Sequence, residues 1–284
     1  MLACHDAGQP TTPARTASGS LRWLGGPTAI LTHGDIRVMT DPMLGPRGPD
    51  AFTLPMHPST GQPNAHFSRY TASPQISFEG LHAIIVSHTH NDHVDTKAKE
   101  VLPKNLPVIV PPSGVETMRA AGFTDVRSLD WGQSVTITAS GTTLEVHAVA
   151  AHHAHDPDLD HKIGRVNGYV LSFSGTGGSY KAYWTGDAVL ADEMKTIATT
   201  FGTIDLLLPH LGGVGGDGDL GKRTMDSEEA ITLTRWVNPL RVIPIHHTTF
   251  SHYREPIEAL EQRATEAGLT PRYVFPVEGR TISL

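Results

Sequence analysis

Short apolar runs alternate with polar segments along most of this chain. A short apolar run bounded by turn residues predicts a strand, whereas apolar positions that recur every three or four residues predict a helix. On this pattern we predict strands at residues 21–31, 36–40, 83–86, 107–110, 126–129, 134–138, 142–150, 168–174, 180–185 and 204–209. The predicted helices are residues 95–102, 113–122, 190–201, 226–237 and 255–267. Strands that alternate with helices in this way predict α/β layers.

Several segments follow neither period. Residues 43–75 contain many prolines, and because so long a loop in a compact domain is usually functional, we predict a lid there. Residues 156–165 are predicted to form a polar loop, and the glycine-rich residues 212–221 a mobile loop. Ser113 and Glu116 have the spacing of a capping box, which predicts the start of the helix that ends near residue 122.

The first residues differ in composition from the rest of the chain. Residues 5–20 are rich in Pro, Thr, Ser and Ala, which predicts a flexible leader over residues 1–20 and a domain over 21–284. Cys4 is the single cysteine, so neither an intramolecular disulfide nor a thiolate metal cage can form. Its setting resembles the end of a bacterial lipoprotein cleavage box, although the rest of a signal peptide is absent. We expect a cytoplasmic protein; a periplasmic lipoprotein anchored through Cys4 is the alternative if the true start lies upstream.

Composition excludes several classes of protein. Hydrophobic residues make up 38% of the 284 positions and charged residues 18%, as in globular domains. No apolar run approaches the roughly 20 residues of a membrane helix. The net charge of −7 argues against a nucleic acid as the partner, so we expect a small-molecule substrate instead. The sequence does not determine the oligomeric state.

Many of the 17 histidines are clustered, most densely just after the predicted strand 83–86. His88, His90, Asp92 and His93 follow one another there, and imidazole and carboxylate are the usual ligands of zinc and related metals. His88 and His90 project to one side of an extended segment. Asp92 and His93 are adjacent and cannot easily share that face, which indicates a second metal. A solvated polar loop is the alternative, but three histidines and an acid rarely occur at this spacing by chance.

His88-Thr89-His90-Asn91-Asp92-His93 resembles the HxHxDH signature of the metallo-β-lactamase superfamily. The resemblance implies a four-layer αβ/βα sandwich with a two-metal site along one edge of its paired sheets. The opening, with Trp23, a glycine-rich turn, a hairpin and Asp41-Pro42, is similar to that of the ascorbate-6-phosphate lactonase-like branch. There the aspartate supports the metal site, which implies that role for Asp41. A turn-capping role for Asp41 is equally open.

Three further motifs imply the remaining ligands. Val149 to His153 resembles the family's Val-Pro-Ala-x-His pattern, with Ala150 in place of Pro, and selects His153; strand periodicity alone leaves His153 and His155 tied. Gly186-Asp187 resembles the motif whose carboxylate bridges the metals, and residues 244–250 resemble the element that supplies His246. The implied ligands of metal one are His88, His90 and His153. Those of metal two are Asp92, His93 and His246, with Asp187 bridging.

The resemblance implies a dinuclear hydrolase with a hydroxide between two divalent metals, zinc first and manganese or iron as alternatives. We expect a small anionic ester, lactone or phosphodiester as substrate, with Asp92 and Asp187 as catalytic residues. A non-catalytic metal-binding module and a lactamase-like amide hydrolase are the alternatives. The family's diiron oxidoreductases carry Glu in place of His90, and its true β-lactamases lack the bridging aspartate. The candidate substrate contacts are His152, His155, Arg165, His210 and His247.

Overall fold

The computed structural model describes residues 19–53, 66–215 and 221–284. Gly19 and Ser20 begin the first strand. The rest of the predicted leader lies outside the described residues, as do Cys4, residues 54–65 of the predicted lid and most of the predicted glycine-rich loop. The division into a leader and one domain therefore stays a prediction.

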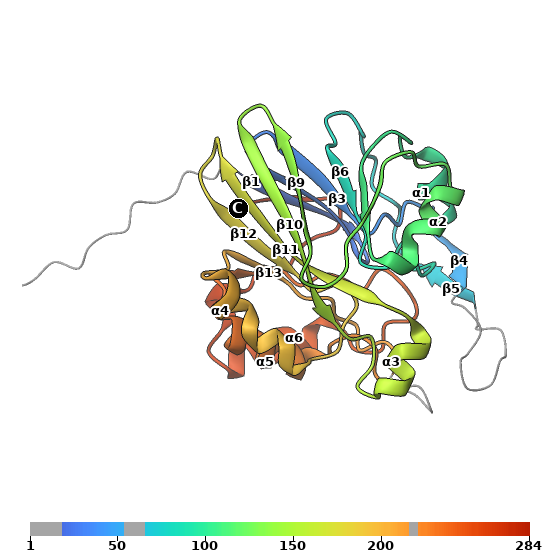
Figure 1. Cartoon of the computed structure of the whole chain (residues 1–284). Helices are drawn as coiled ribbons and strands as arrows, with labels where there is room; N and C mark the ends of the chain where they lie inside the picture. The colour runs from blue at the N-terminus through green and yellow to red at the C-terminus, as the bar shows by residue number, and fades with distance from the viewer. Residues whose placement is uncertain (1–18, 54–65, 216–220) are drawn as a thin grey trace, which may run out of the picture.

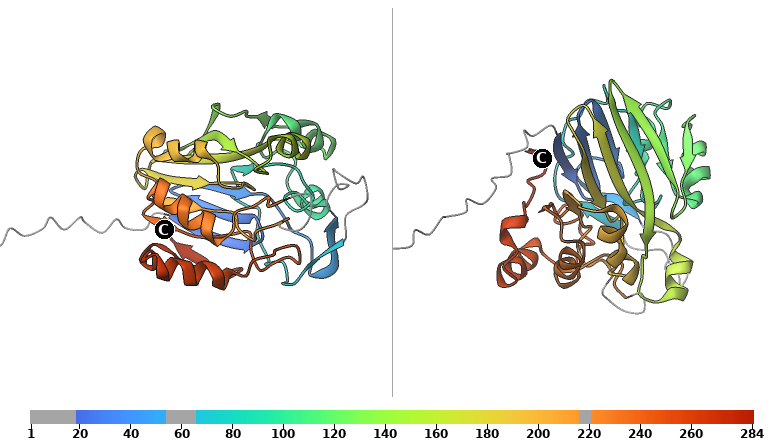
Figure 2. Two further views of the ribbon diagram at one scale, coloured as in Figure 1. Left: turned by 90° about the horizontal axis from the view of Figure 1, so that it is seen from below. Right: turned by 60° about the vertical axis from the view of Figure 1, so that its left-hand side comes forward.

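Two sheets and the helices on their outer faces form the described structure (Figures 1 and 2). The seven-stranded sheet has the order β15 (Thr281–Ser283), β1 (Gly19–Gly25), β2 (Thr28–His33), β3 (Ile36–Thr40), β6 (Ala83–Ile85), β7 (Val108–Val110) and β8 (Val126–Ser128). The six-stranded sheet has the order β14 (Arg241–Val242), β13 (Leu206–Leu208), β12 (Tyr180–Trp184), β11 (Val166–Gly175), β10 (Thr142–Ala151) and β9 (Ser134–Ala139). A separate hairpin pairs β4 (Gly48–Thr53) with β5 (His66–Arg69).

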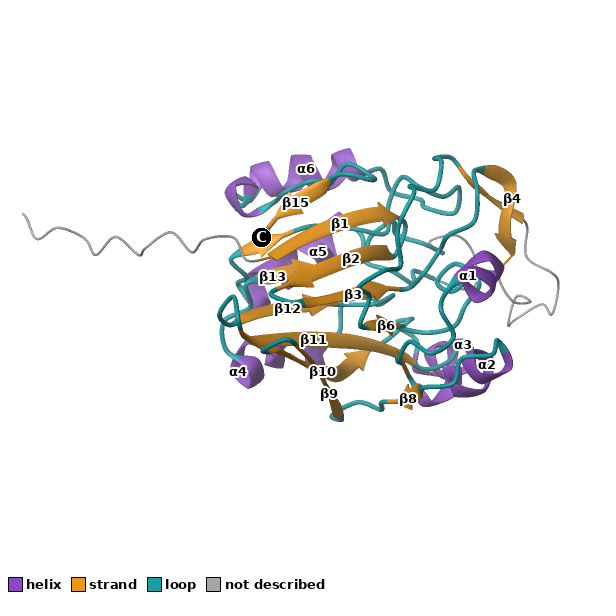
Figure 3. Ribbon diagram, turned by 90° about the horizontal axis from the view of Figure 1, so that it is seen from above, coloured by secondary structure: helices purple, strands orange, loops and turns teal. Residues whose placement is uncertain are grey.

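The helices of the described residues are short. They are α1 (Thr96–Val101), α2 (Val115–Ala120), α3 (Pro157–Ile163), α4 (Ile197–Phe201), α5 (Ser227–Val237) and α6 (Ile257–Glu266), with 3₁₀ turns at Pro112–Gly114, Asp192–Thr196 and Thr270–Arg272. Figure 3 shows α1, α3 and β4 at one end of the sheets. Among the described residues, no helix has both the length and the apolarity needed to cross a membrane.

Alternation along the strands builds three apolar layers. In β11, Tyr169 and Leu171 face the core between the two sheets, whereas Val170 faces the helices α4, α5 and α6. In the other sheet, Val38 faces the central core and Met39 faces α1 and α2. The order helix, sheet, sheet, helix confirms the predicted αβ/βα sandwich. Strands β6, β7 and β13 are buried along their whole length, because both faces of the sheet are covered there, and they appear in the sequence as continuous apolar runs.

Some predicted elements differ from the structure. The predicted strand 21–31 is two strands, because Gly26, at φ 53°, and Pro27 turn the chain between β1 and β2. The segment 43–75, predicted to be irregular, contains the hairpin β4–β5. The segment 190–201 begins as a 3₁₀ turn before it becomes α4.

The predicted polar loop 156–165 is largely helix α3. Asp156 accepts a hydrogen bond from the Leu159 backbone, and Pro157 occupies the first turn, so this helix begins with ordinary capping chemistry. The predicted capping box at Ser113 is wrong: helix α2 begins after Gly114 without a side-chain cap, and the Ser113 hydroxyl contacts the Arg165 carbonyl instead.

Candidate metal centre

The predicted site residues converge because they follow the carboxyl ends of strands that run in the same direction. Strands β3 and β6 are parallel, as are β12, β13 and β14, and β10 runs with β12 because both are antiparallel to β11. The residues that follow these ends are Asp41 after β3, His88 to His93 after β6, His153 after β10, Asp187 after β12 and His246 after β14. One end of both sheets therefore carries the whole group.

The first group of potential ligands is His88, His90 and His153, whose ligand atoms lie within 4.8 Å of one another. One nitrogen of each ring has a protein partner. His153 Nδ1 donates to the Arg223 carbonyl at 3.1 Å, and His90 Nε2 to the Ile163 carbonyl at 3.2 Å. His88 Nδ1 donates to the Ser87 hydroxyl at 3.0 Å. The second nitrogen of each ring is thereby left for another partner, an arrangement usual for histidines that bind metals.

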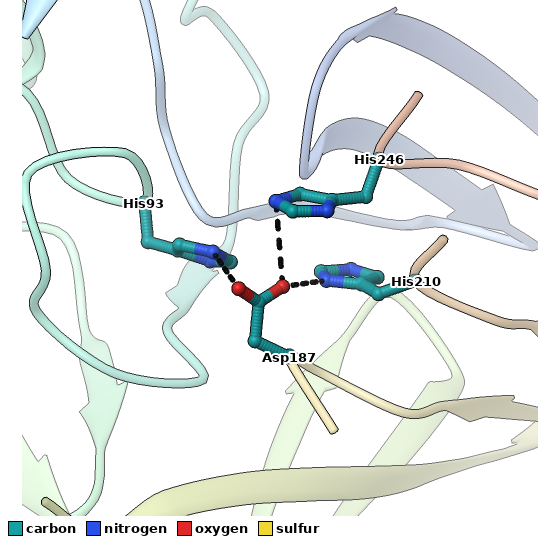
Figure 4. Close-up of side chains that lie close together, drawn as sticks. All are labelled: His93, Asp187, His210 and His246. Carbon is teal, nitrogen blue, oxygen red and sulfur yellow. Dashed lines mark hydrogen bonds and ion pairs between the residues drawn. The ribbon is translucent and has the colours of Figure 1, made fainter. Parts of the chain in front are cut away.

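A second group surrounds Asp187 (Figure 4). Its Oδ2 lies 3.0 Å from His93 Nε2, and its Oδ1 lies 3.4 Å from His246 Nε2. Asp92 is close as well, with Oδ2 3.9 Å from His93 Nε2. His88 belongs both to the first group and to a group with Asp92 and His93. Because His93 also belongs to the group around Asp187, the first group and the Asp187 group adjoin each other.

Two left-handed backbone positions present this second group. Asp41, at φ 25°, accepts a hydrogen bond of 2.6 Å from His93 Nδ1, which turns Nε2 of that ring toward Asp187. His246, at φ 62°, donates its backbone N–H to the Gly26 carbonyl and its Nδ1 to the Leu211 carbonyl. Residues other than glycine adopt such φ values only where surrounding contacts stabilise them.

The donor atoms that remain fit divalent metal ions. Among the described residues, His88 Nε2, His93 Nε2, His246 Nε2 and Asp92 Oδ1 are buried and have no hydrogen-bond partner. Buried polar atoms normally form hydrogen bonds, so a cluster of nitrogen and carboxylate atoms that form none, two of them in ion-pair contact with Asp187, requires an explanation. Imidazole and carboxylate suit zinc, manganese and iron, and the residues present therefore fit the metals that the sequence implies.

Burial keeps two of these rings in the neutral form that binds a metal, whereas neighbouring carboxylates keep a proton on a third. Burial lowers the pKa of His90 to about 4 and that of His246 to about 3, so both rings are neutral near pH 7. Burial alone would raise the pKa of Asp187, but His246 and His93 outweigh it and hold this pKa well below its usual range. Burial would lower the pKa of His93, yet Asp187 and Asp41 raise it well above its ordinary value. A metal that binds His93 Nε2 therefore displaces a proton.

Three of the predicted substrate contacts line a separate cavity of about 460 Å³ beside α3. They are His152, His155 and Arg165. The His155 ring is 53% exposed and pairs with Glu229 at 2.8 Å, away from the first ligand group, whereas His153 lies within that group. None of the proposed metal ligands lines this cavity.

His210 and His247 are not placed to contact a substrate, contrary to the prediction. Both side chains are buried, at 0% and 3% exposure, and both nitrogens of each ring have protein partners. His247 packs against Trp23 with ring centroids 4.6 Å apart. His210 directly follows a buried apolar run, and His247 is separated from one only by His246, which is a sequence signal for burial rather than exposure.

Sequence reasoning missed His252. This ring is 2% exposed, its Nε2 lies 3.5 Å from Asp92 Oδ2, and it belongs to a potential ligand group with Asp92 and His246. Phe52 of the β4–β5 hairpin packs edge-on against it. The one available signal was its place six residues after His246, because no spacing rule connects it to Asp92.

Comparison with known proteins agrees with this geometry. The family model of the Beta-lactamase superfamily domain matches residues 36–247. A UPF0173 metal-dependent hydrolase of Thermus thermophilus is 27% identical over 258 residues, which cover 91% of this chain and 96% of the relative. The N-acyl-phosphatidylethanolamine-hydrolyzing phospholipase D 1 of Caenorhabditis elegans is 26% identical over 258 residues, 84% of this chain and 68% of the relative.

A solved structure shows the same fold. The isothiocyanate hydrolase from Delia radicum gut bacteria superposes with a TM-score of 0.75 at 20% identity, covering 93% of this chain and 99% of that one. The family match spans most of the chain, and it falls on the strands and loops that bring the histidines and aspartates together. The chain therefore belongs to the metallo-β-lactamase superfamily and is a metal-dependent hydrolase.

Proposed function

We propose that this protein is a dinuclear metal-dependent hydrolase that acts on a small anionic ester, lactone or phosphodiester. The observation that carries the proposal is the overlap of the ligand groups. His88 is shared between the group with His90 and His153 and the group with Asp92 and His93, and His93 is shared in turn with the group around Asp187. Ligand atoms arranged in this continuous series suit two ions side by side.

The proposed ligand set has a definite charge. Five neutral imidazoles and two carboxylates leave two divalent cations with two units of positive charge, so the site attracts an anion even though the whole chain is acidic. When bound, the metals would supply an activated hydroxide and stabilise the departing oxygen. Hydrogen bonds hold four of the rings in place for this task. His93 is bound to Asp41, His88 to Ser87, His153 to the Arg223 carbonyl and His246 to the Leu211 carbonyl.

Two elements flank the loop 88–93 and are the proposed determinants of specificity. The Asn91 side chain donates to the Thr53 carbonyl of β4 at 2.7 Å, and His90 donates to the Ile163 carbonyl at the end of α3. Because loops and short elements at the site differ most among relatives, these neighbours are where substrate selection is expected. The nematode relative, named as a phospholipase D, supports a phosphodiester as one candidate.

Elemental analysis followed by a substrate panel tests the proposal. We expect about two metal ions per chain and turnover of at least one lactone, phosphodiester or other ester, with loss of turnover in His153→Ala. His161→Ala, at an exposed position of α3, is the matched control and should keep its metals. Turnover of β-lactams alone would instead identify an amide hydrolase. A protein that binds one metal at most in excess zinc or manganese would refute the dinuclear site.

A further inference from the structure

His210 has the position of a metal ligand. Its ligand atoms lie within 4.8 Å of those of His93, Asp187 and His246, and the ring stacks on His246 with centroids 5.0 Å apart (Figure 4). It is fully buried, like the three residues around it. From proximity alone it would count as a further ligand of the second metal.

The neighbour on the other side of the ring excludes that role. The Trp184 indole nitrogen lies 2.6 Å from His210 Nε2, and an indole N–H can only donate. Nε2 of His210 must therefore accept this bond, and the proton of the neutral ring lies on Nδ1. A metal at Nδ1 would move the proton to Nε2 and place two N–H groups face to face. Both nitrogens of His210 are thus occupied without a metal.

The proton on Nδ1 has one acceptor. His210 Nδ1 lies 2.9 Å from Asp187 Oδ1 and donates a hydrogen bond to it. This bond fixes the rotation of the carboxylate and leaves Oδ2 directed at His93 Nε2, 3.0 Å away. Hydrogen bonds to a carboxylate are among the stronger ones in proteins, and burial removes competition from water.

The sheet fixes this arrangement in space. Trp184 and Leu208 are partners in the parallel pair β12–β13, so the residues that follow each strand are neighbours. The His210 backbone N–H donates to the Thr185 hydroxyl at 3.0 Å. The Trp184 ring stacks on Tyr169 with centroids 5.6 Å apart, which holds the indole N–H toward His210.

We propose that His210 is a positioning residue for Asp187, with its tautomer set by Trp184, and not a metal ligand. The inference rests on the proposed metal site. It adds that the orientation of the bridging carboxylate depends on a buried hydrogen-bond chain from Trp184 through His210 to Asp187. Partners that orient metal ligands typically change metal affinity by about 10–100-fold when they are removed.

Substitutions at three positions test the chain of hydrogen bonds. His210→Leu removes the donor to Asp187, whereas His210→Asn places an amide N–H near the position of Nδ1 and should rescue binding. Trp184→Phe removes the group that sets the tautomer. Tyr183→Phe is the matched control, because its buried hydroxyl has no hydrogen-bond partner among the described residues. Metal affinity by chelator competition and the visible spectrum of the cobalt-loaded protein are the measurements, and urea unfolding of the metal-free proteins reports folding.

We expect the weaker-bound metal to lose about 10–100-fold in affinity in His210→Leu, with a changed cobalt spectrum, and to stay within a few-fold of wild type in His210→Asn and Tyr183→Phe. The metal affinity of Trp184→Phe should lie between those of His210→Leu and wild type. Wild-type affinity and spectrum in a folded His210→Leu would overturn the inference. So would a folded His210→Asn as defective as the leucine variant, because then the imidazole itself is required. If His210→Leu does not fold, the metal affinities of His210→Asn and Trp184→Phe, compared with that of Tyr183→Phe, test the inference instead. A wild-type protein that binds no metal would instead refute the proposed function.

Discussion

Asp41→Asn should weaken metal binding without changing the shape of the site. The Asp41 carboxylate is fully buried and accepts hydrogen bonds from the Ser87 N–H at 2.7 Å, the Ser87 hydroxyl at 2.6 Å and His93 Nδ1 at 2.6 Å. Asparagine has nearly the same volume and tolerates the left-handed backbone at φ 25°. The substitution therefore isolates the hydrogen bonds.

The amide cannot accept on both sides. If its oxygen faces the Ser87 N–H, its NH₂ group faces His93 Nδ1, and His93 must adopt the opposite tautomer, with its proton on Nε2. The wild-type ring can release its Nε2 proton and keep the one on Nδ1, whereas in the variant the proton stays on the nitrogen directed at Asp187 and the proposed metal. If the amide flips, the Ser87 N–H loses its acceptor instead. A hydrogen bond to a charged group contributes about 1.5–3 kcal/mol, so the metal-free protein should lose roughly that amount of stability.

Metal affinity should fall by about 10–100-fold, the usual effect of removing a partner of a ligating histidine. Chelator competition measures the affinity, and urea unfolding in a chelator measures the stability. Asp35→Asn, in the exposed turn between β2 and β3, is the control and should change neither. If Asp41→Asn binds both metals as wild type does, the Asp41–His93 hydrogen bond does not set the tautomer, and the reasoning fails.

Three further outcomes follow from the structure. Removal of the metals by a chelator should lower the melting temperature, because ions that bind only the folded state stabilise it; an unchanged melting temperature would contradict this. Elemental analysis should show that His153→Ala loses a metal while His155→Ala keeps both. The reverse result would mean that the metal ligand after β10 is His155, two residues further along the chain. Arg69→Met should cost about 3–5 kcal/mol in urea unfolding, because Arg69 is buried and pairs with Glu278 at 2.9 Å. Arg127→Met is the matched control: Arg127 pairs with Asp125 at the half-exposed surface, so this substitution should cost less than about 1 kcal/mol.

The features predicted best from the sequence are those that depend on neighbouring residues in the chain. His88 to His93 are contiguous, so their chemistry is visible without a fold, and the resemblance they support led to the sandwich that the comparisons confirm. The ligand assignments stay a prediction that the geometry supports. Helix α3 was missed because none of its residues is buried, which removes the apolar period, although Asp156 and Pro157 carried its start signal.

The sequence-based predictions failed for residues whose roles depend on contacts between distant segments. His210 was taken for a substrate contact because nothing in its own neighbourhood reveals that Trp184 lies on one side and Asp187 on the other. His252 was not considered, since its approach to Asp92 requires the segment after β14 to fold back over the loop after β6. Pairings of this kind follow from strand order, which residue spacing does not encode.

The order in which the proposed ligands appear along the chain has a consequence for how the protein would acquire metal. The loop 88–93 leaves the ribosome first, and Asp187 and His246 follow much later. At about 5–20 residues per second, roughly 8–30 s separate the synthesis of His93 from that of His246. Until then the early loop has donors but no complete cage. The proposed cage would therefore close only late in synthesis, so the ions available where the chain finishes folding would contribute, with the ligand types and their geometry, to which metal it carries.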